Sequence, residues 1–292
     1  MEPTNTSHQR NSITRCQALL GTYVEINISA SKSDDQLVEM SNKAFVRIKE
    51  IETLMSFHDK NSELSYLNKE AFKGPCSISP EMKEVLSQAL SLSAKTDGIY
   101  DISIAPKLME QDLLPHHDPY SDINDFKGSW KDINLKDNIV EFNKDIQIDL
   151  GGIAKGYAID QALSLIEDSD SNISINAGGD LVMSDWQSKT ARIKFSNKGD
   201  HIDIDMHRKA LASSACYYLN GKSAIISPLT QKPVLSDDTI SVFANNCMLA
   251  DALTKVVFLQ GEKALNLLEE TGAIAFKTDK NGFSKIISKN VL

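Results

Sequence analysis

The stretch DIQIDLGGIAKGYAIDQA, from Asp145 to Ala162, joins two hydrophobic patterns of different period. Apolar residues occupy every second position from 146 to 150, which is the pattern of a half-buried strand. After the pair Gly151-Gly152 the apolar spacing becomes helical and continues past Ala162. The stretch therefore predicts a strand, a tight turn and a helix, and the other motifs are best understood around it.

The glycine pairs of this chain suit an anionic ligand. Because Gly151 and Gly152 lack a Cβ atom, backbone amides there can approach a ligand closely, and the helix N-terminus behind them favours negative charge. Lys155 adds a cation one turn into the helix. A second pair, Gly178-Gly179, ends the β-like run NISINA and precedes an acid. Neither GxGxxG nor GxxxxGK[ST] is present, so a plain tight connection is the alternative to a phosphate or diphosphate site.

Composition and charge exclude several classes of partner. The chain has 292 residues, 41% of them hydrophobic and 24% charged, which is ordinary for a globular protein with a sizeable core. The net charge of −9 argues against a surface for nucleic acid or anionic lipid. An anionic ligand therefore needs locally concentrated positive charge or a divalent cation.

Neither the cysteines nor the adjacent histidines predict a metal site. The four cysteines are far apart and form no CxxC pair, so we expect buried thiols. We expect His116-His117 in an exposed loop, because adjacent side chains rarely converge on one ion. No apolar run approaches the ~18 residues of a membrane span. The first residues lack a hydrophobic signal core, which predicts a cytoplasmic location as the sequence stands, or a periplasmic one if an export signal has been removed.

Elsewhere strands and helices alternate or mix. We expect residues 1–14 to form a disordered arm, because they contain few apolar side chains, and residues 15–292 to form one domain. Ser33 and Gln36 form a capping-box pair that starts a long amphipathic helix. Further expected elements are a strand within Leu19–Ser29, a polar loop at Met55–Asn68, helices at Ser79–Lys95 and Asn245–Leu268, paired strands at Arg192–Phe195 and Ile202–Met206, a strand at Ala212–Tyr218, a strand and turn within Gly221–Val234, and a hairpin of Ile274–Phe276 with Phe283–Ile287. This mixture indicates an α/β mixed (α+β) fold.

Six motifs in this order resemble the ApbE family of FAD:protein FMN transferases. They are LLGTYVEI, MSFHDKNSELSYLN, TDGIYDISIAPKL, DLGGIAKGYAID, INAGGD and ADALTK, and they extend over Leu19–Gly272. The resemblance implies an ApbE-like fold of interlocked sheet-and-helix subdomains. It also implies an activity: these enzymes split FAD at its diphosphate and attach the FMN half to a Ser or Thr of a partner flavoprotein, releasing AMP and requiring Mg²⁺.

The resemblance also implies a magnesium site. Phosphoryl transfer needs charge neutralisation and positioning, which Mg²⁺ held by a few oxygen ligands can supply. In the family the ligands are an Asp and a Thr of one helix and an alanine carbonyl, which correspond here to Asp251, Thr254 and Ala154. In many relatives the Thr stands four positions after the Asp, where this chain has Lys255. We expect Thr254 to reach the ion, since positions i+3 and i+4 face the same side; the alternative is that Lys255 places an ammonium there.

The resemblance assigns the remaining contacts with the dinucleotide. Lys155, next to Gly151 and Gly152, would contact phosphate. Asp180 as acceptor of the proton of the target hydroxyl is our own assignment. Phe57 as a core aromatic and Asp101 as a turn cap are the alternatives. Residues implied to hold the flavin and adenine are Met55, Ser56, Phe57, Glu63 and Asp101, with Asn176, Ala177, Gly178, Gly179 and Asp180 along the other wall.

One segment departs from the family pattern. Where many members have HIIDPxTGxP, this chain has AIISPLTQKP, so Ala224, Ser227 and Gln231 replace His, Asp and Gly. Alanine can neither accept a proton nor bind phosphate. The Ser-Gly before it is Ser214-Ala215 here. Two alternatives to FMN transfer follow: a homologue that binds FAD without transferring it, and a hydrolase that cleaves FAD to FMN and AMP.

Overall fold

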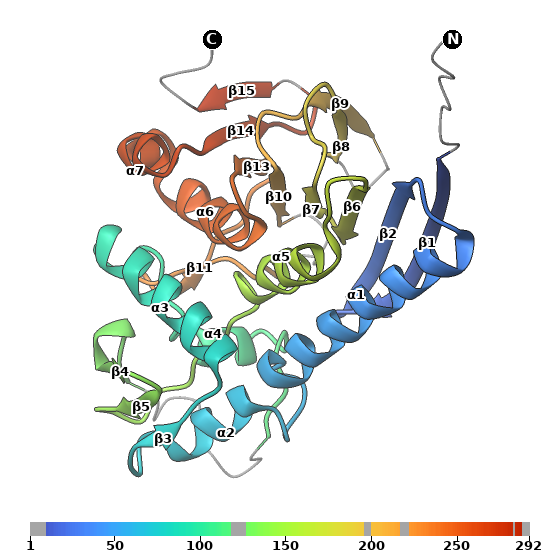
Figure 1. Cartoon of the computed structure of the whole chain (residues 1–292). Coiled ribbons are helices and arrows are strands. Elements are labelled where there is room, and N and C mark those ends of the chain that lie inside the picture. The colour runs from blue at the N-terminus through green and yellow to red at the C-terminus, as the bar shows by residue number, and fades with distance from the viewer. Residues whose placement is uncertain (1–9, 118–126, 196–199, 217–221, 283, 288–292) are drawn as a thin grey trace, which may run out of the picture.

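The fold is built on one antiparallel sheet of eight strands (Figure 1), in a computed structural model that describes residues 10–117, 127–195, 200–216, 222–282 and 284–287. Each neighbouring pair of its strands is antiparallel. In spatial order the strands are β1 (Asn11–Leu19), β2 (Thr22–Ala30), β6 (Asn172–Ala177), β7 (Asp180–Met183), β10 (Ala210–Ala215), β13 (Thr239–Ala244), β14 (Ile274–Thr278) and β15 (Ser284–Ile287).

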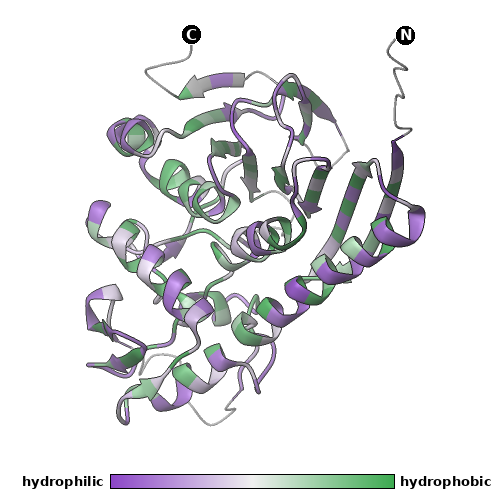
Figure 2. Ribbon diagram, viewed as in Figure 1, coloured by the Kyte–Doolittle hydropathy of each residue, from purple (hydrophilic) through white to green (hydrophobic). Residues whose placement is uncertain are grey.

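Helices cover one face of this sheet and extend beyond it (Figure 1). The long helix α1 packs on β1, β2 and α5, whereas α6 packs on α5, β10 and β13. Within these elements, green apolar residues alternate with polar ones along the strands and form stripes on the helices (Figure 2). The helices are α1 (Asp34–Met55), α2 (Glu63–Glu70), α3 (Pro80–Lys95), α4 (Ala105–Met109), α5 (Ala154–Ile166), α6 (Cys247–Gln260) and α7 (Leu265–Thr271), with 3-10 turns at Trp130–Asp132 and Gly261–Ala264.

The other face of the sheet carries a separate, smaller apolar cluster. Phe243 and Phe276 meet there edge to face, with ring centroids 5.5 Å apart, and Ile193 of the β8–β9 hairpin covers them. No described helix is long and apolar enough to cross a membrane. The remaining strands are β3 (Cys76–Ser77), β4 (Ile133–Lys136), β5 (Ile139–Phe142), β8 (Thr190–Lys194), β9 (His201–Asp205), β11 (Ile226–Ser227) and β12 (Lys232–Pro233).

Several elements predicted from local signals are confirmed. Ser33 caps α1 with both hydrogen bonds of the capping box, since its hydroxyl accepts from the Gln36 amide and its own amide donates to the Gln36 side chain. Ser79 caps α3, and Pro80 occupies its first turn. The expected β8–β9 pair and the hairpin of β14 with β15 are present. Mixed helix and sheet content is confirmed as the fold class.

The segment before Gly151 is extended but is not a strand of any sheet, contrary to the prediction. Its apolar side chains Ile146, Ile148 and Leu150 are buried as the period-two pattern requires. A side chain replaces the partner strand: Asn68 Oδ1 accepts from the Ile148 amide at 2.8 Å, and Asn68 Nδ2 donates to the Ile148 carbonyl at 2.9 Å. The period-two pattern predicted the burial of these side chains correctly. It predicted strand pairing incorrectly, because the Asn68 side chain makes the backbone hydrogen bonds that a neighbouring strand would make.

Four other predictions need correction. The arm expected to end at residue 14 gives way to β1 at Asn11, where pairing with β2 supplies backbone hydrogen bonds that the polar side chains did not reveal. The loop expected at 55–68 contains α2, capped by Ser62. The helix expected to reach Leu268 stops at Gln260, because Gly261 has a positive φ of 55°, and a new helix follows. The strand expected at 212–218 starts at Ala210, and residues 217–221 lie outside the described residues.

Gly156 allows α5 and α6 to approach closely. A Cβ added there would lie 2.3 Å from the Cys247 carbonyl oxygen. We therefore expect Gly156→Ala to lower the free energy of unfolding by about 1–3 kcal/mol through overpacking, measured by urea denaturation. Gly74→Ala is the control, because an added Cβ there meets nothing within 4 Å. A Gly156→Ala protein as stable as the control would contradict this close helix contact.

Candidate active site

A cavity of about 580 Å³ lies where the sheet, the glycine turns and the helices meet. This volume is within the range of small-molecule sites, and most of the wall is apolar. Separate parts of the chain supply its polar groups: the residues after α1, the loop before α4, the turn before α5 with the start of that helix, the β6–β7 turn, β10, and α6. The lining includes Met55, Ser56, Phe57, Asp101, Gly151, Gly152, Ala154, Lys155, Gly178, Asp180, Ser214, Ala224 and Lys255.

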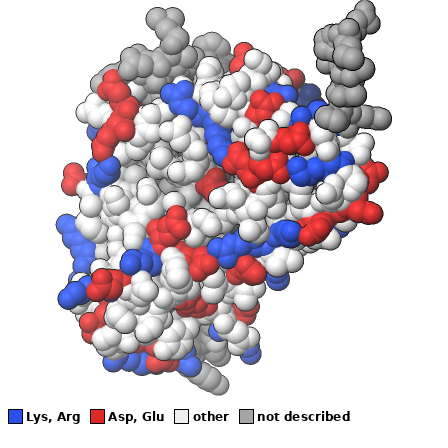
Figure 3. Space-filling view, viewed as in Figure 1, with Lys and Arg blue, Asp and Glu red and all other residues white. Residues whose placement is uncertain are grey.

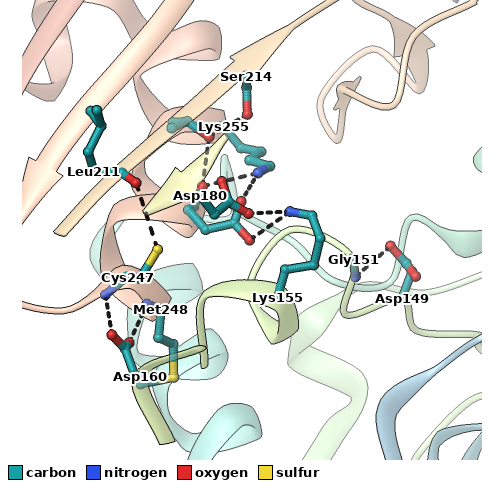
Figure 4. A network of polar contacts seen from close by, with 12 residues as sticks. Asp149, Gly151, Lys155, Asp160, Asp180, Leu211, Ser214, Cys247, Met248 and Lys255 are labelled. Atoms are coloured by element: carbon teal, nitrogen blue, oxygen red, sulfur yellow. Dashed lines mark hydrogen bonds and ion pairs between the residues drawn. The ribbon is translucent and has the colours of Figure 1, made fainter. Parts of the chain in front are cut away.

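Two lysines and two aspartates form a cluster at the polar end of the cavity (Figure 4). Lys155 Nζ lies 2.5 Å from Asp180 Oδ2 and 3.4 Å from Asp251 Oδ2. Lys255 pairs with Asp251 Oδ1 and donates to the Asp251 carbonyl at 3.1 Å. The two carboxylates are almost fully buried, so each depends on an ammonium to remain charged.

The electrostatics distinguish the two carboxylates. Burial and the nearby Asp251 charge raise the pKa of Asp180 above its ordinary value, although Lys155 and Lys255 act in the opposite direction. Burial also disfavours the Asp251 carboxylate, but the two lysines outweigh burial and lower its pKa. Desolvation disfavours the Lys155 ammonium, but Asp180 and Asp251 outweigh it and raise the lysine pKa. Asp251 is therefore a fixed charge, and Asp180 is the more basic carboxylate.

Helix α6 is fixed in place by capping from two sides. The Asn246 side chain accepts from the Leu249 amide at 2.8 Å. Asp160 of α5 accepts from the amides of Cys247 and Met248, both at 2.8 Å (Figure 4). Burial raises the pKa of Asp160 to about 6 against the lowering effect of those hydrogen bonds. These caps set the position of Asp251 and its neighbours relative to α5.

Thr254 does not point into the cavity, although we expected it to face the ion. Its side chain is fully buried. The Thr254 hydroxyl donates to the Asp251 carbonyl at 2.7 Å and shares a 2.7 Å hydrogen bond with Ser214 of β10. The neighbouring Lys255 side chain lines the cavity instead.

This donor set does not fit the magnesium ion that the family resemblance implies. Mg²⁺ needs several free oxygen ligands in octahedral geometry. Both carboxylate oxygens of Asp251 already contact ammonium groups, and the Thr254 hydroxyl is hydrogen-bonded to the Asp251 carbonyl and to Ser214. Ala154, the first residue of α5, lines the cavity. Within the described parts of the chain no group of three or more His, Cys, Asp or Glu could hold a metal.

A side chain braces each of the two glycine turns, and the Gly178-Gly179 turn has the backbone conformation that glycine favours. Gly178 and Gly179 have positive φ values of 64° and 110°. Asn176, at the end of β6, accepts from the Gly179 amide at 3.1 Å and so holds this turn. At the other turn, Asp149 accepts from the Gly151 amide at 3.0 Å. Sequence patterns predicted both turns but not the two side chains that brace them.

The residues expected to contact flavin and adenine divide into two groups. Met55, Ser56, Phe57 and Asp101 line the cavity. Phe57 is also a core residue, because its side chain is 4% exposed. Glu63 is not among the lining residues, since it accepts from the amide and hydroxyl of Ser79 and so holds the start of α3. Asn176, Ala177 and Gly179 are likewise outside the lining, although they belong to the turn that presents Gly178.

Asp101 braces a loop at the cavity wall, as the turn-cap alternative proposed. Its Oδ1 accepts from the amide and hydroxyl of Ser103, and its Oδ2 accepts from the Trp130 amide at 3.2 Å. Burial raises the pKa of Asp101 against these hydrogen bonds. The Asp101 carboxylate therefore lines the pocket, and its hydrogen bonds hold the surrounding loop in place.

Two features at or beside the pocket were not predicted from the sequence, and a third, Lys255, was given only as the alternative to Thr254. Tyr100 lines the pocket and is 5% exposed, and burial raises the pKa of its hydroxyl well above the ordinary value. His117, expected to be a solvated loop residue, is exposed but stacks on Phe57 with ring centroids 5.6 Å apart. Lys255 lies across Gly152, where an added Cβ would be 3.1 Å from its Cε. Its helical spacing from Asp251 is what indicated the alternative of an ammonium at this position.

Comparison with known proteins identifies the family. Its model, described as the ApbE family, matches residues 20–276. The chain belongs to the ApbE family. A FAD:protein FMN transferase of Haemophilus influenzae is 26% identical over 271 residues, which cover 81% of this chain and 78% of that protein. A FAD:protein FMN transferase of Escherichia coli K12 is 24% identical over 293 residues, covering 91% and 83%.

Solved ApbE structures share the fold. An ApbE protein of Thermotoga maritima superposes with a TM-score of 0.78 at 21% identity, covering 96% of this chain and 97% of that one. The flavin transferase ApbE of Vibrio cholerae gives a TM-score of 0.77 at 20% identity, with 95% and 97% covered. The expected ApbE-like fold is therefore confirmed.

The segment that departs from the ApbE pattern borders the cavity. Ala224 lines it with an exposed side chain, so the position of the family histidine faces the site but carries no titratable group. Gln231, at the position of the family glycine, has a positive φ of 56°. The Gln231 backbone therefore has a left-handed conformation, which glycine adopts more readily than other residues.

Proposed function

We propose that this protein binds FAD and transfers its FMN half to a Ser or Thr hydroxyl of an acceptor flavoprotein, releasing AMP. The observation that carries the proposal is the cluster of Lys155, Lys255, Asp180 and Asp251 at the polar end of an otherwise apolar cavity. Ammonium groups between two glycine turns suit a diphosphate. The names of the ApbE relatives support FAD as the dinucleotide.

The two ends of the cavity would bind different parts of the dinucleotide. Apolar and aromatic side chains such as Met55, Phe57 and Tyr100 can contact the flat rings of a dinucleotide. The polar end would hold the diphosphate beside Lys155 and the α5 N-terminus, where the helix dipole favours negative charge. Because the chain as a whole carries a charge of −9, the diphosphate depends on ammonium and amide groups placed directly beside it.

The chemical step would be an in-line displacement at the FMN phosphorus. The acceptor hydroxyl oxygen forms a new P–O bond, the bond from that phosphorus to the bridging oxygen breaks, and AMP leaves with the bridging oxygen. The hydroxyl proton passes to Asp180, whose raised pKa suits a base. Lys155 and Lys255 offset the negative charge that gathers on the diphosphate.

The expected magnesium ion has no step in this proposal. Asp251, Thr254 and Ala154 were the candidate ligands, and the contacts of Asp251 and Thr254 are already made within the protein. In place of a metal ion, the site offers the ammonium groups of Lys155 and Lys255 as contacts for the diphosphate. The acceptor would be a separate flavoprotein. On the face shown in Figure 3, acidic and basic side chains are interspersed and form no continuous basic area.

Intact-mass measurement tests the proposed transfer. The protein is incubated with FAD and a purified acceptor domain, in separate samples with EDTA and with Mg²⁺. Transfer predicts a mass gain on the acceptor equal to FMN less one water, together with released AMP. Tight FAD binding without any mass gain would support the alternative suggested by Ala224, a homologue that binds FAD only. AMP release in the absence of acceptor would identify a hydrolase.

A further inference from the structure

Lys255 stands four positions after Asp251, where the family resemblance expects a metal-binding Thr. Its side chain is 20% exposed, lines the cavity and lies across Gly152, whose missing Cβ leaves room for it. Two of its three N–H groups are directed to Asp251, one to the carboxylate and one to the backbone carbonyl. One N–H therefore remains for a ligand in the cavity.

The formal charges of the cluster balance without a metal ion. The carboxylates of Asp180 and Asp251 are matched by the ammonium groups of Lys155 and Lys255. A divalent cation at Asp251 would have to displace an ammonium from each oxygen it bound, and it would lie beside two positive charges. Both effects oppose metal binding at this carboxylate.

Burial distinguishes this pair from an ordinary pair of charges on a helix. Glu39 and Lys43 of α1 have the same i,i+4 spacing, but their side chains are 65% and 59% exposed. Exposed pairs of this kind contribute little to stability. Asp251 is 1% exposed, so its charge depends on its partners, and Lys255 is held where a ligand enters.

We propose that the Lys255 ammonium replaces the divalent cation in this protein, so that FAD binds through Lys155 and Lys255 without metal. The inference rests on the proposed function in one respect, that FAD is the ligand. It goes further by making the lysine ammonium, rather than a metal ion, the group that donates to the diphosphate.

The test measures FAD affinity by quenching of flavin fluorescence, in EDTA and in millimolar Mg²⁺. The wild-type dissociation constant is expected to be the same in both, within about threefold. Lys255→Thr removes the ammonium and provides a hydroxyl four positions after Asp251. In EDTA this variant is expected to bind FAD about 10- to 100-fold more weakly, the loss of a charge-assisted hydrogen bond, and Mg²⁺ is expected to restore its affinity. Lys43→Thr is the matched control and should behave as wild type.

Mn²⁺ binding followed by electron paramagnetic resonance gives a second readout that does not depend on transfer. Wild-type protein with FAD should leave Mn²⁺ free, whereas Lys255→Thr with FAD should bind it. Wild-type FAD binding that requires Mg²⁺, or Mn²⁺ bound by the wild type, would overturn the inference while leaving the proposed function intact. Absence of FAD binding by the wild type under every condition would overturn the proposed function and the inference with it.

Discussion

Lys155→Met is expected to lower the free energy of unfolding by about 3–5 kcal/mol, because it leaves buried carboxylates without their shared partner. Lys155 Nζ contacts both Asp180 and Asp251, which are 4% and 1% exposed. Lys255 still pairs with Asp251, so the larger part of the loss should arise at Asp180. FAD affinity should also fall about tenfold or more, since one of the two ammonium groups for the diphosphate is gone. Urea denaturation and flavin fluorescence measure the two effects.

Two companion variants show whether charge is the cause. Lys155→Arg keeps the positive charge and should retain most of the stability. The double variant Lys155→Met with Asp180→Asn removes the unpaired carboxylate and should recover part of the loss, because the remaining amide is neutral. Equal stability of Lys155→Met and wild type would show that the cluster does not hold buried charge as described.

Asp180→Asn is expected to slow FMN transfer about 10²–10⁴-fold, the usual contribution of a general base, while FAD affinity changes little. An amide cannot accept the hydroxyl proton. The pKa of the Asp180 carboxyl is raised by burial and by Asp251, so the wild-type rate should fall as the pH is lowered through that value, where the base becomes protonated. Initial rates of acceptor mass gain between pH 5 and pH 8 measure both effects.

Asp203→Asn is the control for this variant. Asp203 lies in β9, pairs with Arg192 and has a side chain that is 55% exposed, so its loss should leave the rate and the pH profile unchanged. Thermal denaturation of Asp180→Asn verifies that the protein is folded. A folded Asp180→Asn protein that transfers FMN at the wild-type rate would exclude Asp180 as the base.

Local signals in the sequence predicted much of the fold. The capping residues Ser33 and Ser79 marked helix starts correctly, because a cap is a hydrogen bond within four residues of the chain. Alternation along 24–28 marked the strand β2, whose apolar side chains face the core. The spacing of apolar residues along the chain indicates which face of an element is buried, so these elements could be predicted without a structure.

Pairing between distant segments could not be derived in this way. Residues 146–150 have the alternation of a strand, but Asn68, about 80 positions earlier, satisfies Ile148 in place of a neighbouring strand. β1 carries mostly polar side chains and was missed because its stabilisation comes from the β2 backbone. Whether such segments form strands depends on which distant segments of the chain pack beside them.

The same limit applies to the candidate site. Spacing placed Asp251, Thr254 and Lys255 on one helix, and both i+3 and i+4 were compatible with one face. Only the packing of β10 against α6 decides between them, because Ser214 engages Thr254 and leaves Lys255 to the cavity. Contacts between Lys155 and two acids 25 and 96 positions away were likewise invisible in the sequence.

A crystal structure of the FAD complex, prepared from protein treated with EDTA, tests the central claim most directly. The FAD diphosphate is expected within hydrogen-bond distance of Lys155 Nζ and Lys255 Nζ, beside the turn at Gly178, with no metal ion between the phosphates and Asp251. A diphosphate bound away from both lysines, or FAD that enters the crystal only with a divalent cation on Asp251, would contradict this claim.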